Sequence, residues 1–298
     1  MAKRNTNRII NYTLNKRIEQ KYGNDLFNVS SEVDNIVRSF TQKLDTSKQI
    51  RIEDVSDLID ALKNYSERIS GWAEETAGRM VYSLGSQDLQ QWESHAKNMS
   101  DLLKKELRRT DTSAILRQYL ADNVHLIKSL PLSAAQRVHN MVYRGLTSGR
   151  RPASIAKEIM KTGNVTKSRA MLIARTETGR ATTGLIKTRA EQIGLNWFVW
   201  RVTHDKRLRK SHRMMDGVLC TWGDAPNPEA LFPEPKIKAY GKYLPGATFN
   251  CRCWAAPLIR ASSDASWPAR VHINGRITRM NLKQFLELSG QEFYKKAA

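Results

Sequence analysis

Three short groups in the second half of the chain hold the residue types that carry chemistry. They are Ala174-Arg-Thr-Glu-Thr-Gly-Arg180, Asp205-Lys-Arg-Leu-Arg-Lys-Ser-His212 and Asn250-Cys-Arg-Cys253. Histidine, cysteine and carboxylate side chains bind transition metals or move protons. Metal binding and acid–base chemistry are therefore the two kinds of chemistry to consider first.

Metal binding would begin from the two neighbouring cysteines. Cys251 and Cys253 occupy alternate positions, so both thiols face one side of an extended segment. Zinc needs further ligands. The candidates are His212, His204, Cys220 and Asp205. A Cys-x-Cys pair is a weaker signal than two Cys-x-x-Cys pairs, and buried thiols also serve as small hydrophobic residues. We expect no cofactor, and zinc held by His212, Cys251 and Cys253 stays open as an alternative.

Acid–base chemistry would begin from His212, with Asp205 as the carboxylate that orients its ring. Residues 205–213 hold five Lys or Arg, and like charge disfavours a protonated histidine there. We therefore expect Asp205 and His212 to hold a long loop through side-chain hydrogen bonds. Glu177 can pair with Arg180 three residues on and is expected to tie its helix to that loop. These roles are scaffolding rather than catalysis.

Familiar catalytic motifs are absent from the sequence. It has no Gly-rich phosphate loop, no H-E-x-x-H, no G-x-S-x-G and no cluster of paired carboxylates. A nuclease with two metal ions needs several convergent acids, and the basic half has few. We therefore expect a protein that is not an enzyme and has no catalytic residues. The alternative is a metal-dependent enzyme that acts on nucleic acid through His212, Asp205, Cys251 and Cys253.

The charge is large and unevenly distributed. The 298 residues hold 49 Lys and Arg against 29 Asp and Glu, a net charge of +20. Residues 31–93 hold twelve acids and seven bases, a net −5, so the rest of the chain carries +25. Residues 161–213 hold thirteen bases and three acids, a net +10. This asymmetry indicates two surfaces with different partners, and the basic one favours a polyanion, with nucleic acid first.

Cysteine content and hydropathy restrict the compartment. Three cysteines are too few for a disulfide framework and indicate a reducing environment. No apolar run approaches the roughly 18 residues of a membrane span, and the basic start lacks the apolar stretch of a secretory signal. We expect a protein made in the cytosol, with no membrane partner.

The pattern before about residue 148 is helical. Apolar residues recur at spacings of three and four, as at Ile52, Val55, Leu58, Ile59 and Leu62. We expect residues 1–27 to form a polar, basic arm. Pro131 is expected to break one helix and Ser133 to cap the next. Trp72 and Trp92 are expected in the core.

A long helix is expected from about Thr166 to Gly194, after a shorter one that starts near Pro152. At 100° per residue, one face of the long helix would carry a basic stripe and the opposite face would be buried. The stripe holds Arg169, Thr176, Arg180, Thr183 and Lys187, and the buried face holds Ala170, Met171, Ala174, Thr178, Ala181 and Leu185.

Beyond residue 194 the chain becomes rich in aromatic and β-branched residues and prolines. We expect a strand at 196–203, a hairpin with an Asn-Gly turn at 271–278 and a helix at 281–296. The fold class is therefore α+β, with a helical N-terminal module followed by a mixed module that has a long basic helix, short antiparallel strands and long loops. The expected module boundaries are 1–150, 151–260 and 261–298.

In their order and spacing, these groups resemble the Mu-F-like phage head morphogenesis family, also called minor head or minor capsid proteins. The resembling residues are Ile173-Ala-Arg-Thr-Glu-Thr178, Trp197 to Trp200, Thr203, Asp205, Arg207, Arg209, His212, Asp216-Gly217, and Phe249-Asn-Cys-Arg-Cys253 with Pro257. They lie within residues 150–260, about a third of the chain. Some members have another cysteine between the aspartate and the histidine, where this chain has Leu208, and this departure argues against zinc.

The resemblance implies a structural virion protein, present in few copies in the head interior near the portal vertex and in the host cytoplasm during assembly. The implied partners are the portal protein and packaged double-stranded DNA, with the major capsid protein as a further candidate. The implied roles are head assembly and DNA packaging or delivery.

The family motif falls on Arg175, Glu177, Asp205, Arg207, Arg209, His212, Asn250, Cys251, Arg252 and Cys253. The residues expected to contact DNA are Arg169, Arg180, Lys187, Lys206, Arg207, Arg209 and Lys210. A host nucleic-acid-binding protein without a virion role is a further alternative. The missing recognition helix, RNA-binding signature and repeated metal finger disfavour it.

Overall fold

The computed structural model describes residues 15–96, 99–233 and 239–290 of the chain. They form two compact units that are interleaved in sequence. One unit, here the helical unit, holds residues 16–82 and 117–177. The other, here the mixed unit, holds residues 83–116 and 178–290. The observed α+β class confirms the sequence-based prediction.

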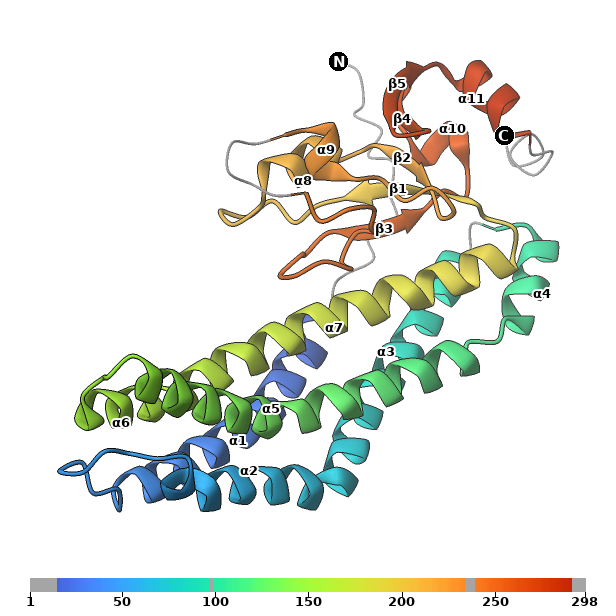
Figure 1. The fold of residues 1–298 in the computed structure, drawn as a ribbon. Helices are drawn as coiled ribbons and strands as arrows, with labels where there is room; N and C mark the ends of the chain where they lie inside the picture. Colours follow the sequence, from blue (N-terminus) through green and yellow to red (C-terminus); the bar gives the residue numbers. More distant parts are fainter. Residues whose placement is uncertain (1–14, 97–98, 234–238, 291–298) are drawn as a thin grey trace. The chain divides into compact units, whose positions relative to one another are not determined.

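The helical unit is built from long helices (Figure 1). Its elements are α1 (Lys16–Thr41), the 3-10 helix η1 (Glu53–Val55), α2 (Ser56–Arg68), the first part of α3 (Ser70–Ala96), most of α5 (Ser113–Thr147), α6 (Pro152–Met160) and the first half of α7 (Thr162–Gln192). Helix α1 packs against both α2 and α6. The shared core is aliphatic and includes Val33, Val37, Leu58, Leu62, Val138, Val142 and Ile155. Burial of these side chains is the main favourable contribution to the unit's stability.

Two predictions for this unit were wrong. The expected arm is helical from Lys16 onward, because Tyr22 and Leu26 are buried on the inner face of α1; residues 1–14 lie outside the described residues. Pro131 does not break a helix but lies inside α5, where Leu130 and Ala134 beside it are buried. Proline removes one backbone hydrogen bond from a helix, and here the packing on both sides holds the helix together.

The mixed unit contains a five-stranded sheet of order β3-β1-β2-β4-β5 (Figure 1). The strands are β1 (Trp197–Arg201), β2 (Leu219–Thr221), β3 (Trp254–Pro257), β4 (Ala269–Ile273) and β5 (Arg276–Met280). The pairing of β2 with β4 is parallel and the other three pairings are antiparallel. Shorter helices complete the unit: α4 (Asp101–Arg109), α8 (Lys210–Met215), α9 (Pro228–Leu231), α10 (Ala261–Asp264) and α11 (Leu282–Ser289).

Strand β1 separates two hydrophobic clusters, because successive side chains of a strand point to opposite faces. Phe198 and Trp200 belong to one cluster, together with Trp92 of α3. Trp197 and Val199 belong to the other, where the ring centroids of Trp197 and Phe285 lie 5.0 Å apart. The prediction of a core Trp92 is thus confirmed, whereas Trp72 is only half-buried.

The predicted strand after residue 194 and the predicted hairpin are confirmed as β1 and as β4 with β5. Asn274 and Gly275 connect the hairpin with positive φ angles of 48° and 74°, as a two-residue turn of this kind requires. The last described helix ends at Ser289, earlier than expected, before Gly290 in the left-handed conformation. Residues 291–298 of the predicted helix lie outside the described residues.

The basic stripe predicted on the long helix was wrong. Helix α7 begins at Thr162, four residues early, and buries Thr176 and Thr183 of the stripe while Met171 of the opposite face is exposed. Thr183 donates a hydrogen bond of 2.6 Å to the Pro245 carbonyl oxygen, so this face packs against a loop. None of the described helices is long and apolar enough to cross a membrane.

Candidate metal centre

A histidine and two cysteines from distant parts of the sequence meet in the mixed unit. The Nδ1 atom of His212 lies 3.5 Å from Cys251 Sγ and 3.3 Å from Cys253 Sγ. These three donor atoms all lie within 4.8 Å of one another. The three residues are at most 4% exposed. The structure therefore gathers the alternative zinc ligands of the sequence into one cluster.

A tight turn brings the two cysteines to the histidine. His212 lies on α8, whereas Cys251 and Cys253 lie just before β3. Asn250 precedes them with φ 55°, a left-handed conformation that asparagine adopts more readily than most residues. The N–H of Cys251 donates to the Thr248 carbonyl oxygen at 3.1 Å. The turn gives Asn250 a structural reason to stand directly before the Cys-x-Cys pair.

The second ring nitrogen of His212 faces a buried polar pair. Nε2 lies 2.8 Å from the Tyr243 hydroxyl and 3.4 Å from Glu229 Oε1. The Tyr243 hydroxyl donates to the Glu229 carboxylate at 2.7 Å. Glu229 is 4% exposed. Sequence reasoning missed both residues, because only the tertiary fold brings α9 and residue 243 to the histidine.

The surroundings shift the pKa values of several groups in this cluster. The hydrogen bond with the Cys253 thiol, together with His212, lowers the pKa of Cys251. Burial, reinforced by the Glu229 carboxylate, raises the pKa of Tyr243. Burial also raises the pKa of Cys220, which lies elsewhere on β2. Cys251 is therefore the cysteine of the three that most readily becomes a thiolate.

Asp205 and His212 have different partners in the structure. The Arg252 guanidinium donates to Asp205 Oδ1 at 2.9 Å, and the Arg207 backbone N–H donates to the same oxygen at 2.8 Å. Thr203 donates to the Arg252 carbonyl oxygen at 2.7 Å. The general-base pair considered from the sequence does not form among the described residues, since Asp205 binds Arg252 rather than His212. Asp205 does hold the loop, as the sequence predicted.

Two further residues considered as zinc ligands also lie elsewhere. His204 Nε2 is 3.3 Å from Asp216 Oδ2. The Cys220 thiol is fully buried and directed to the Val218 carbonyl oxygen at 3.8 Å. Of the ligands proposed from sequence, the cluster thus takes the one histidine and the two cysteines 251 and 253.

Residues 136–256 match the family described as Phage Mu protein F like protein. We call this matched region the Mu-F-like module. The match confirms the resemblance noted from the sequence.

Two curated relatives align with most of the chain. An uncharacterized protein of Haemophilus influenzae is 28% identical over 220 residues, which cover 72% of this chain and 46% of the relative. The NAD(+)–arginine ADP-ribosyltransferase EFV of Enterococcus faecalis is 26% identical over 223 residues, which cover 68% of this chain and 45% of the relative. The chain thus spans about half the length of these relatives. No solved structure matches significantly.

The Mu-F-like module exposes a group of cations on the loop before α8 and on α8 itself. Four of these cations are exposed to solvent, namely Lys206, Arg207, Lys210 and Arg213. Arg209, within the same segment, is instead engaged, because it donates to the Phe249 carbonyl oxygen at 2.9 Å and lies over the Tyr240 ring at 5.0 Å. We call the four exposed residues the α8 basic group. Arg209 belongs to the scaffold of this segment.

The other predicted DNA contacts lie along α7. Arg180 is exposed. Lys187 is half-buried, with Nζ 3.8 Å from the Glu191 carboxylate. Arg169, in the helical unit, donates to Ser129 Oγ at 3.1 Å. These residues do not form the continuous stripe expected from the sequence.

The α7 motif residues Arg175 and Glu177 lie in the helical unit. Arg175 Nε is 3.3 Å from a Glu19 carboxylate oxygen, so this arginine ties α7 to α1. Glu177 is 6% exposed. Its burial indicates a structural residue, and the predicted tie to the loop that carries Asp205 stays a prediction.

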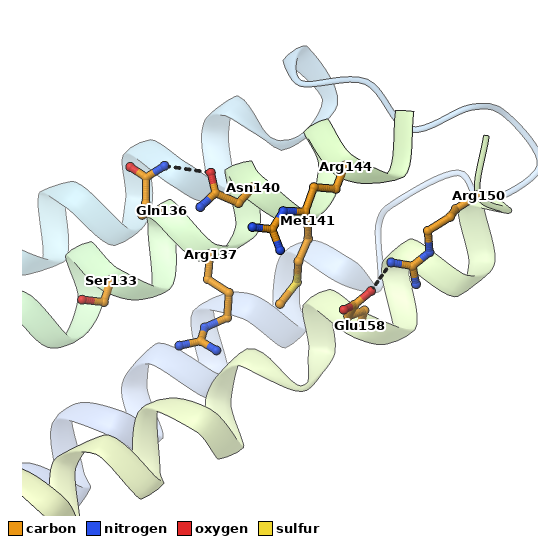
Figure 2. Close-up of a pocket in the computed structure, with 8 residues that line it drawn as sticks. All are labelled: Ser133, Gln136, Arg137, Asn140, Met141, Arg144, Arg150 and Glu158. Atoms are coloured by element: carbon orange, nitrogen blue, oxygen red, sulfur yellow. Dashed lines mark hydrogen bonds and ion pairs between the residues drawn. The ribbon is translucent and has the colours of Figure 1, made fainter. Parts of the chain in front are cut away.

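An open pocket of about 530 Å³ lies in the helical unit, and most of its lining belongs to the Mu-F-like module (Figure 2). Its lining includes Arg137, Arg144 and Arg150. The Arg150 guanidinium pairs with the Glu158 carboxylate at 2.5 Å. The pocket is therefore basic, with one of its arginine charges neutralised by Glu158. It is a secondary candidate site for the binding of an anion.

Proposed function

We propose that this protein is a structural minor head protein of a tailed phage, which acts in head assembly and in DNA packaging or delivery. The observation that carries the proposal is the match of residues 136–256 to the Phage Mu protein F like family. In this proposal the protein lies inside the head near the portal vertex, and it reaches that place from the host cytoplasm during assembly. No membrane takes part in the assembled head.

The proposed DNA contact follows from the charge. A net charge of +20 would be attracted to the phosphates of packaged DNA without reading its sequence. The α8 basic group offers four exposed cations on one short segment. The ion pair between Asp205 and Arg252 holds the start of that segment, so its cations are presented from a fixed backbone.

The proposed portal contact uses the acidic part of the chain. Residues 31–93 carry a net −5 within a strongly basic protein. On η1 and α2, exposed carboxylates succeed one another at Glu53, Asp57, Asp60 and Glu67. A row of carboxylates is repelled by DNA and suits a basic protein surface. We assign this surface to the portal protein, with the major capsid protein as the other outcome.

Removal of the gene from its phage tests the proposed function. A lysogen that lacks the gene is induced, and particles are examined by electron microscopy and by their DNA content. The expected result is a large loss of infectious particles, with heads that are malformed, empty or unable to deliver DNA. A plasmid copy of the intact gene restores the titre.

A second plasmid sharpens the test of the portal contact. It carries the gene with Glu53→Lys, Asp57→Lys and Asp60→Lys. These exposed changes leave the folded core intact, so the variant is expected to accumulate normally but to be depleted from heads that contain portal. An undiminished titre after deletion of the gene would overturn the proposed function. Normal incorporation of the lysine variant would overturn only the portal surface.

A further inference from the structure

We propose that the Mu-F-like module holds one zinc ion through His212 Nδ1, Cys251 Sγ and Cys253 Sγ. The ion cross-links α8 to the turn before β3. It thereby restrains the segment that carries the α8 basic group. This metal site does not depend on the proposed role in the phage head, and the two can be tested separately.

The spacing of the three donor atoms fits a tetrahedral zinc site. With Zn–N of about 2.0–2.1 Å and Zn–S of about 2.3 Å, tetrahedral angles place nitrogen and sulfur about 3.5 Å apart. The observed distances from His212 Nδ1 are 3.5 Å to Cys251 Sγ and 3.3 Å to Cys253 Sγ. The two sulfur atoms lie within 4.8 Å of one another, so adjustment of the side chains alone would let one ion bind all three atoms.

The histidine is oriented as metal-bound histidines usually are. When one ring nitrogen binds a metal, the other commonly donates its hydrogen to a carboxylate or another oxygen, which fixes the ring. Here Nδ1 faces the thiols, and Nε2 faces the Tyr243 hydroxyl at 2.8 Å and the Glu229 carboxylate at 3.4 Å. A buried carboxylate is unfavourable in an apolar core unless a cation or a hydrogen-bond donor stabilises it. An imidazole bound to a metal cation would be such a partner for Glu229.

The sulfur atoms have surroundings that suit a bound thiolate. The Gly246 N–H donates to Cys251 Sγ at 3.3 Å. The ring of Trp200, itself fully buried, lies edge-on to the His212 ring with centroids 5.9 Å apart and covers one side of the cluster. Backbone N–H donors and an apolar surround stabilise a metal–thiolate site against protonation and solvent.

Two thiolates and an imidazole select the metal class. Soft sulfur donors with nitrogen favour zinc over calcium or magnesium, which prefer oxygen. Within the part of the chain that the structure describes, the cluster contains three such ligands. A water molecule would complete the tetrahedron. The three protein ligands come from two segments about 40 residues apart in sequence, so the ion acts as a cross-link between them.

Metal content of the intact protein tests the proposal. The full chain without a tag is produced in zinc-supplemented medium, purified without chelator and analysed by mass spectrometry of its metals. The expected result is one zinc per chain. His212→Gln and Cys251→Ser are expected to lower the zinc content at least tenfold. Cys220→Ser is the matched control, since it removes a buried cysteine outside the cluster and should retain one zinc.

A measurement on the unaltered protein guards against variants that fail to fold. X-ray absorption at the zinc edge is expected to show two sulfur neighbours at about 2.3 Å and lighter neighbours at about 2.0–2.1 Å. Metal-free wild-type protein overturns the proposal. So does bound zinc with a shell of nitrogen and oxygen alone. Equal zinc loss in Cys220→Ser and Cys251→Ser variants that both remain folded would also overturn it.

Discussion

The backbones of Gly179 on α7 and Gly246 in the loop before the cysteine turn lie in direct contact. A Cβ atom added at Gly179 would stand 2.9 Å from the Gly246 carbonyl oxygen. Gly246 has φ 85°, which favours glycine, and its N–H donates to Cys251. The absence of a side chain at Gly179 therefore allows the loop that contains Gly246 to pack directly against α7, and this loop shapes the candidate metal centre.

Gly179→Ala should destabilise the protein by about 1–3 kcal/mol, because the added methyl group meets backbone rather than a flexible side chain. Urea unfolding monitored by circular dichroism measures the change. Gly78→Ala is the control: it lies inside α3, where a Cβ has its nearest neighbour at 3.9 Å. That change should be neutral or stabilise the protein by up to about 1 kcal/mol. Equal effects of the two changes would refute the close contact.

Reversal of charge in the α8 basic group should weaken DNA binding. The variant carries Lys206→Glu, Arg207→Glu and Lys210→Glu. Each lost phosphate contact lowers the slope of log K against log salt by about 0.9, so the slope should fall by up to about 2.7. Fluorescence anisotropy with a labelled duplex, over a series of salt concentrations, measures it. Arg209 is left intact because it binds the Phe249 carbonyl oxygen.

The control for this reversal has the same net charge but changes the acidic region. It carries Lys43→Glu, Lys48→Glu and Lys63→Glu, all at exposed positions. Its affinity should fall much less, since a long-range loss of charge is screened beyond about 10 Å at 0.1 M salt. Equal losses for the two triple variants would show that net charge, rather than the α8 basic group, governs binding.

Glu229→Gln should weaken zinc binding without removing a ligand. The amide is a poorer partner for the second nitrogen of His212, and loss of such a supporting group typically costs 10- to 100-fold in metal affinity. Competition with a chromophoric chelator measures the dissociation constant. Asp224→Asn, which alters a half-buried acid paired with Lys242, is the control and should keep its affinity. Unchanged affinity in Glu229→Gln would remove Glu229 from the site.

The buried ion pair of Asp88 and Arg189 should leave a signature in the pH dependence of stability. Burial raises the pKa of Asp88 to about 6, although Arg189 lies 2.5 Å away. The folded state therefore keeps a proton between about pH 4 and 6 that the unfolded state has lost. The contribution of this carboxyl to stability is complete below about pH 4 and is lost as the pH rises through 6.

Comparison of the wild type with Asp88→Asn isolates this effect. The difference between their free energies of unfolding should change by roughly 2–3 kcal/mol between pH 4 and 6.5, in favour of the wild type at the acid end, and then stay level. Urea titrations at a series of pH values measure the difference. A difference independent of pH would show that Asp88 has an ordinary pKa.

Local signals in the sequence were sufficient for some elements. The Asn274-Gly275 turn predicted the hairpin because its positive φ angles are a property of two residues. The aromatic and β-branched run predicted β1 for the same reason. The predicted basic stripe on α7 was wrong, because the burial of Thr183 depends on Pro245, which is 62 residues away in the sequence.

The candidate metal centre was predictable only in part. The alternation of Cys251 and Cys253 placed both thiols on one side, and the structure brings His212 to them. Glu229 and Tyr243 carry no local mark of their role, because nothing in their spacing relates them to the histidine. The partner of Asp205 was not predictable, because nothing in the sequence shows that Arg252, 47 residues away, binds it.

Analysis of purified phage heads tests the proposed function. A phage-producing lysate is fractionated on a density gradient, and the chain is quantified by mass spectrometry against the major capsid protein in each fraction. Under the proposed function, the protein should co-migrate with DNA-filled heads at a few copies per head. Its absence from every particle fraction, while it is present among the free proteins of the lysate, would contradict a structural role in the virion.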